Sequence, residues 1–169
     1  MTDVLDPASP RALLRRVKAL EDRFRALAVV LAGGQYAADI GGARDINTTG
    51  VFQTYMGAPS VVVVVPTSGR LLVSWGFRGY NNQTTASTVR LAPAMSGANT
   101  VTPSPGDSGG ATVVIGSTTA TTPIPADMTR LFEGLAPGTT TVALQAYISS
   151  GTSATNKIND SWLRVEPLP

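Results

Sequence analysis

The sequence predicts a mainly β protein: an antiparallel β-sandwich or jelly roll preceded by an N-terminal coiled-coil helix. Two observations lead to this fold class. Over residues 10–32, apolar side chains recur at alternating spacings of four and three, which is the heptad pattern of a coiled coil. From about residue 48 onward, short runs of β-branched and aromatic residues alternate with clusters of Gly, Pro, Ser and Thr, and no second helical pattern interrupts them.

Clear start and stop signals bound the helix. Ser9 can cap the free N–H groups of the first turn, and Pro10 suits the first helical position because its missing donor costs nothing there. The pair Gly33-Gly34 ends the helix, since glycine tolerates the left-handed conformation that closes one. We therefore expect four parts: a docking segment over 1–9, a coiled-coil helix over 10–32, a linker over 33–47 and a β-sandwich head domain over 48–169.

The apolar side chains of the helix form one stripe, which we interpret as an interface between copies of the chain. This apolar stripe consists of Leu13, Val17, Leu20, Phe24, Leu27 and Leu31. With Val17 at heptad position a, Arg16 lies at g and Glu21 at the following e, where an interchain ion pair forms in a parallel coil. An exposed pair of this kind contributes roughly a few tenths of a kcal/mol, so it sets the register more than the stability.

The number of chains in the coil follows from the side chains in and beside the stripe. Val at position a with Leu at position d favours a coiled coil of two chains. Leu14, Ala28 and Val30 widen the stripe, and Phe24 needs a wide core, which favours three. We expect a homotrimer, in which the heads associate as well because three heptads alone are marginal. The alternative is a single amphipathic helix folded back on its own head, since the same spacings serve both arrangements.

The head is expected to contain about eight strands, each bounded by turn residues. They are placed at 50–55, 61–65, 70–79, 88–91, 112–115, 128–132, 140–148 and 161–166. Strict alternation in two of them assigns inward-facing sets: Leu71, Val73, Trp75 and Phe77, and Val142, Leu144, Ala146 and Ile148. An immunoglobulin- or fibronectin-like sandwich is the alternative fold, because the turn at 134–138 is typical of those domains, although their corner aromatic is missing after it.

The composition excludes most catalytic chemistry. The chain has no cysteine and no histidine, which removes disulfides, Cys-ligated metals and the commonest general base. Gly106–Gly110 reads Gly-Asp-Ser-Gly-Gly, as around the nucleophile of chymotrypsin-like proteases, but no histidine can activate Ser108. The two lysines, Lys18 and Lys157, lie on the helix and in a polar turn, so neither replaces it. We expect no enzyme, and no catalytic, cofactor-binding or metal-binding residues.

Charge is concentrated on the helix. Six of the 13 basic residues lie between positions 11 and 25, whereas residues 33–169 hold seven basic and seven acidic side chains. We interpret the basic positions as the solvated face of the coil and expect no nucleic-acid partner. The N-terminus, with Asp3 and Asp6, does not match a signal peptide, and no apolar run is long enough to span a bilayer. The expectation is a protein made in a cytoplasm and not inserted into a membrane.

The two tryptophans have different expected places. Trp75 alternates with core residues and is assigned to the interior. Trp162 alternates away from Leu163 and Val165, which places it on the surface or at a subunit interface. Exposed tryptophan and tyrosine side chains could offer a platform for carbohydrate.

Residues 48–168 resemble the C-terminal β-domains of actinobacterial-phage virion proteins of the minor tail type. The segments that carry the resemblance are Ala58–Val61 leading into Thr67–Val73, Arg90–Ala92, Ser96–Ala98, Leu131–Gly138 and Trp162–Leu168. The resemblance implies a homotrimeric, jelly-roll-like appendage of the virion, on the tail or decorating the capsid. Its implied partners are other virion proteins and, for host attachment, surface glycans. The alternative function is a standalone carbohydrate- or protein-binding β-sandwich module.

Overall fold

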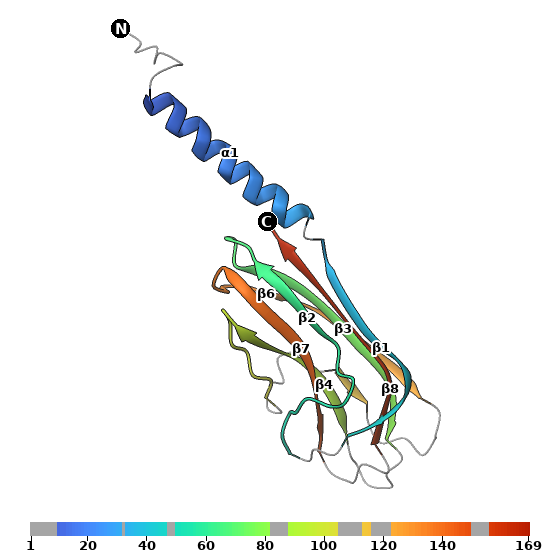
Figure 1. Ribbon diagram of the computed structural model, residues 1–169. Helices are drawn as coiled ribbons and strands as arrows, with labels where there is room; N and C mark the ends of the chain where they lie inside the picture. The colour runs from blue at the N-terminus through green and yellow to red at the C-terminus, as the bar shows by residue number, and fades with distance from the viewer. Residues whose placement is uncertain are drawn as a thin grey trace.

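The computed structural model describes residues 10–31, 33–46, 50–81, 88–104, 113–115, 123–149 and 156–169. In this part of the chain, one helix precedes two four-stranded sheets that face each other (Figure 1). The elements are α1 (Pro10–Leu31), β1 (Gln35–Asp45), β2 (Ser60–Val65), β3 (Arg70–Asn81), β4 (Val89–Gly97), β5 (Val113–Ile115), β6 (Ile124–Phe132), β7 (Gly138–Ile148) and β8 (Asn156–Leu168). The predicted fold class, a mainly β antiparallel sandwich with an N-terminal helix, is confirmed.

Each sheet is antiparallel throughout. The first has the order β1-β8-β3-β6, and the second has the order β2-β7-β4-β5. The expected strand over 50–55 is wrong: Gln53 forms only an isolated bridge to Ala146, beyond the end of β2 along β7. Gly50 and Gly57 have φ angles of 85° and 82°, so an extended strand does not continue through either end of this segment.

The expected linker over 33–47 is also a strand for most of its length. Residues Gln35–Asp45 form β1, which pairs with β8 from Gln35↔Val165 to Asp45↔Lys157. The register shifts between Ile40 and Arg44, where Gly41 and Gly42 lie. The glycine pair therefore marks a β-bulge in an edge strand, and not a flexible connection. Because only residues 32–34 separate α1 from β1, little chain is available to fold the helix back.

The core lies between the two sheets and contains the side chains that alternation assigned to it. All eight residues of the two predicted inward-facing sets are buried, and Trp75 is fully buried as expected. Its indole Nε1 donates a hydrogen bond to the backbone carbonyl oxygen of Leu91 at 3.1 Å. Trp75 belongs to β3 and Leu91 to β4, so this bond satisfies a buried polar group and joins the two sheets.

The helix α1 extends away from one end of the sandwich (Figure 1). No strand in the described part of the chain packs closely against it. The alternative in which the helix folds back on its own head is therefore not the arrangement observed. Residues 1–9, the expected docking segment, lie outside the described residues.

We predict that the stability of the head depends on the side chains between the sheets. Leu144 on β7 is fully buried, so Leu144→Ala should lower the free energy of unfolding by about 2–5 kcal/mol. The matched control is Val62→Ala on β2, where the side chain is 60% exposed and the loss should stay below about 1 kcal/mol. Denaturant unfolding measures both; equal losses would contradict the assignment of the core.

Candidate functional site

The apolar stripe of α1 is the first candidate site. All six of its residues lie within the helix, and the side chains of Leu13, Val17 and Leu20 are 52%, 48% and 53% exposed. Leu14, which widens the stripe, is 69% exposed. Their spacing places these leucines and this valine on one side of the helix. A set of large apolar side chains thus faces solvent in the single chain.

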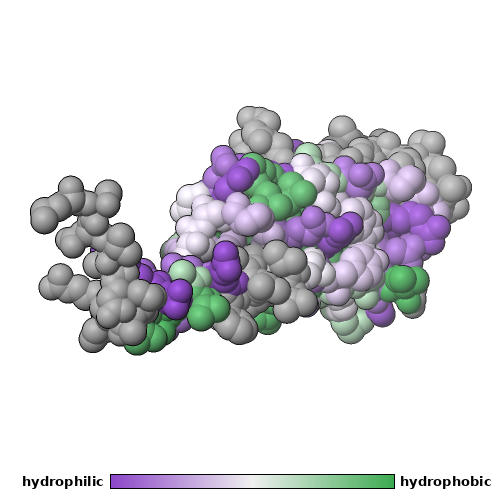
Figure 2. Space-filling view, turned by 90° about the horizontal axis from the view of Figure 1, so that it is seen from above, coloured by the Kyte–Doolittle hydropathy of each residue, from purple (hydrophilic) through white to green (hydrophobic). Residues whose placement is uncertain are grey.

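Charged side chains flank this stripe. Arg16 and Glu21, the residues of the predicted interchain ion pair, are both exposed on α1. Their pairing, and the number of chains in the coil, stay predictions. Phe24, Leu27 and Leu31 belong to α1, but their side chains lie outside the described residues. In the space-filling view, hydrophobic and hydrophilic side chains lie together on the helix, while much of the head surface is of intermediate hydropathy (Figure 2).

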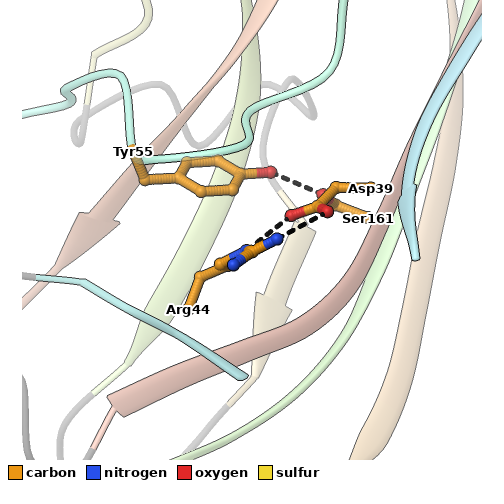
Figure 3. Close-up of polar contacts among 4 residues, drawn as sticks. All are labelled: Asp39, Arg44, Tyr55 and Ser161. Carbon is orange, nitrogen blue, oxygen red and sulfur yellow. Dashed lines mark hydrogen bonds and ion pairs between the residues drawn. The ribbon is translucent and has the colours of Figure 1, made fainter. Parts of the chain in front are cut away.

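A second candidate site is a polar cluster at the β1 edge of the head, formed by Asp39, Arg44, Tyr55 and Ser161 (Figure 3). Arg44 Nε donates to Asp39 Oδ2 at 2.9 Å, and Arg44 Nη2 donates to Asp39 Oδ1 at 3.1 Å. The bulge in β1 brings the two side chains together, since they stand on either side of it. Tyr55 Oη donates to Ser161 Oγ of β8 at 2.7 Å.

The electrostatics of the cluster favour a fixed structure over acid–base chemistry. The hydrogen bonds from Arg44 hold the pKa of the Asp39 carboxyl below its ordinary value of 3.8. Burial raises the pKa of the Tyr55 phenol well above its ordinary value, and the hydrogen bond to Ser161 offsets only part of this effect. Asp39 is therefore ionised and Tyr55 neutral over the physiological range. Neither group is poised to exchange a proton there.

The cluster fastens the connection between β1 and β2 to the edge of the sheet. Gly57 packs directly on the ion pair, because a Cβ at this position would overlap a carboxylate oxygen of Asp39. A hollow of about 420 Å³ lies beside the cluster, lined by residues 43–46 and 53–56. This cluster was not expected from the sequence, in which the available signal is an acidic and a basic residue on either side of the Gly41-Gly42 pair.

The structure describes only part of the chain, so statements about metal sites and membrane-spanning helices apply to that part. Within the described ranges, no group of three or more acidic side chains is placed to hold a metal ion. The Gly106–Gly110 segment lies outside the described residues. Among the helices that are described, none combines the length and apolar character needed to cross a bilayer.

The Asp39–Arg44 pair should make the stability of the head sensitive to acid. The carboxyl has a lower pKa in the folded chain than in the unfolded chain, so its contribution is complete above about pH 3.8 and is lost as the pH falls below that value. Asp39→Asn should therefore destabilise the protein at pH 7, and the difference from wild type should shrink toward pH 2. Denaturant unfolding across this range measures it.

Arg44→Gln is the companion variant, because the guanidinium is the main cause of the lowered pKa. It should remove the same pH-dependent part of the stability. A difference between wild type and Asp39→Asn that is constant with pH would contradict the described role of the pair.

Comparisons with known proteins assign no family. No family model matches the chain, and no curated protein matches it. The solved structures that are distantly similar include the following three. A CBM35 from Cellvibrio japonicus Abf62 has 16% identity and a TM-score of 0.35, with 80% of this chain and 98% of that chain covered. A Xyl-CBM35 in complex with a glucuronic acid-containing disaccharide has 16% identity and a TM-score of 0.35, covering 79% and 99%. A family 35 carbohydrate-binding module from Clostridium thermocellum has 17% identity and a TM-score of 0.34, covering 81% and 100%. These likenesses are too distant to carry a functional assignment.

Proposed function

We propose that the chain is a homo-oligomeric structural appendage, in which α1 associates with α1 of sister chains and groups the β-sandwich heads at one end. The observation that supports this proposal is the apolar stripe, whose described members Leu13, Val17 and Leu20 face solvent along a helix that the head leaves uncovered. Association would remove these side chains from water, which is the main driving force for joining protein surfaces.

A second copy of the chain is the partner that suits the stripe. The 4–3 spacing places a and d residues along one line, so that identical helices can interdigitate over their whole length. Arg16 and Glu21 add complementary charges at g and e of neighbouring chains, which would hold a parallel register. A helix built to bind a flat surface of another protein would not need this repeat or this charge placement.

The energetics call for a contribution from the heads. Full burial of a Leu, Val or Phe side chain is worth about 1.5–3 kcal/mol, and the described members of the stripe are already about half covered in the single chain. The three described members then gain roughly 2–5 kcal/mol per chain. Association costs about 4–15 kcal/mol. The gain from these side chains does not exceed this cost, so we propose that contacts between heads add to the coil.

The resemblance of residues 48–168 to phage virion proteins supports a place on a virion, as a tail fibre or a capsid-decorating spike. In this proposal the 1–9 segment and the start of α1 bind other virion proteins, and the heads point outward, where they can contact host-surface glycans. We favour a trimer, because of the wide stripe. No enzymatic activity is part of the proposal.

We predict that a charge placed in the stripe separates the chains. Leu20→Asp should convert a particle of three-chain mass into single chains, because a carboxylate at position d would be buried between helices. The far-ultraviolet circular dichroism should keep its β character, since α1 does not pack on the head. Size-exclusion chromatography with light scattering gives the mass.

Ala19→Asp is the matched control, because it adds the same charge to the neighbouring exposed position outside the stripe. It should leave the mass unchanged. A wild-type protein that runs as a single chain at micromolar concentration would overturn the proposal, and would favour the alternative of a standalone binding module. A two-chain mass would keep the helical interface and contradict the trimer.

A further inference from the structure

The outer face of the β1-β8-β3-β6 sheet carries a tryptophan between two small residues. The registers align Ala38 of β1, Trp162 of β8, Gly76 of β3 and Asp127 of β6 in one row across the sheet. Trp162 is half-buried and points away from the core, since Ser161 and Leu163 on either side of it are buried. Trp162 thus lies on the outer face of the sheet, which agrees with the expectation of a place on the surface or at a subunit interface.

The indole of Trp162 leans over β3 along the surface of the sheet. Its Nε1 lies 2.7 Å from where a Cβ of residue 76 would be, so the ring occupies the space that a side chain on Gly76 would fill. Glycine weakens the interior of a strand and marks a site of close approach. Here it leaves room for the half-buried indole to lie over β3.

Most of the side chains on either side of this indole are polar. Same-face neighbours along a strand are about 6.5–7 Å apart. One step away in one direction are Tyr36, Arg164, Ser74 and Thr129, and one step in the other are Ile40, Asp160 and Arg78. Tyr36 is 62% exposed, Ser74 Oγ lies 2.8 Å from Thr129 Oγ1, and Arg78 Nη2 lies 2.5 Å from Asp160 Oδ2.

We infer that this face is a binding site for a neutral hexose unit of a glycan, with Trp162 as the platform on which the sugar ring stacks. A pyranose ring has an apolar face of C–H groups that can lie on the solvent side of the indole. Its hydroxyls then reach outward to the hydroxyl pair Ser74–Thr129 and to the carboxylate of Asp127. An apolar centre with a few convergent polar groups is the general form of a small-ligand site.

The charges on the face favour a neutral sugar over an acidic one. The three arginines that β3 and β8 place on this face each pair with a carboxylate: Arg70 with Glu133, Arg78 with Asp160 and Arg164 with Glu166. Asp127 forms no ion pair with any described residue, so the face has a net negative charge. A uronic acid would be repelled there.

This inference deepens the attachment role within the proposed function, but the site lies within one head and does not require the coil. Its test uses the indole N–H signals of the full-length protein in two-dimensional ¹H–¹⁵N NMR. The chain has two tryptophans, and the second, Trp75, is fully buried with its N–H bonded to Leu91. Trp162→Ala assigns the two signals by removing one.

The probes are β-1,4-linked hexasaccharides of glucose and of galactose, an α-1,6-linked mannose hexasaccharide, and a galacturonic acid hexasaccharide as the acidic counterpart. We expect a neutral hexasaccharide at millimolar concentration to shift the Trp162 signal in a saturable way and to leave the Trp75 signal in place. Trp162→Ala should weaken binding, measured by calorimetry, by about tenfold or more. Val64→Ala, an exposed apolar residue on the other sheet, should leave binding unchanged.

Three results would overturn the inference: no shift with any neutral hexasaccharide, stronger binding of the galacturonic acid hexasaccharide, or equal binding by wild type and Trp162→Ala. A Trp162 signal that shifts with protein concentration alone would also overturn it, and would assign the face to contact between heads. The same titration on Leu20→Asp separates the two proposals. Sugar binding by single chains of Leu20→Asp would support the site on the head independently of the oligomer. A stable wild-type oligomer that binds no sugar would contradict the site and leave the proposed coiled coil in place.

Discussion

The proposed assembly of this protein depends on the apolar stripe of α1, which the β-sandwich head of the same chain leaves exposed. Leucine and valine side chains on α1 face solvent because the helix leaves the sandwich at one end and packs on none of the described strands. Exposure of so many large apolar groups on one helix face is unfavourable in water and is typical of a surface that meets a partner. The proposed oligomer, the grouping of the heads and the outward display of their faces all follow from covering this stripe.

The junction between helix and head enforces this exposure. A flexible segment of 15 residues would have allowed α1 to fold back, but β1 begins at Gln35 and is held along its length by β8. Three residues remain between the two elements. The Asp39–Arg44 pair and the Tyr55–Ser161 hydrogen bond then fasten the following connection to the same edge.

Alternation along the chain predicted the part of the core that β3 and β7 contribute. In β3 and β7 every second residue is apolar, and those residues are buried between the sheets, Trp75 among them. Alternation failed where pairing depends on a distant partner. Residues 35–45 are rich in glycine and alanine and resemble a linker, yet they form a strand because β8, more than 100 residues later, supplies the hydrogen-bond partners. The contacts of Asp39 with Arg44 and of Trp162 with Gly76 arise from a bulge and a register, and local sequence specifies neither of them.

The central claim is that identical helices associate in parallel through the stripe, and a distance between chains tests it most directly. Because the chain has no cysteine, Arg15→Cys introduces a single site for a spin label at heptad position f, on the outer side of the coil. Pulsed dipolar spectroscopy should give one narrow distribution at about 20–30 Å, the scale of two helix diameters. The distribution should vanish when Leu20→Asp is added. Absence of dipolar coupling in the labelled chain, or a distribution unchanged by Leu20→Asp, would contradict the account.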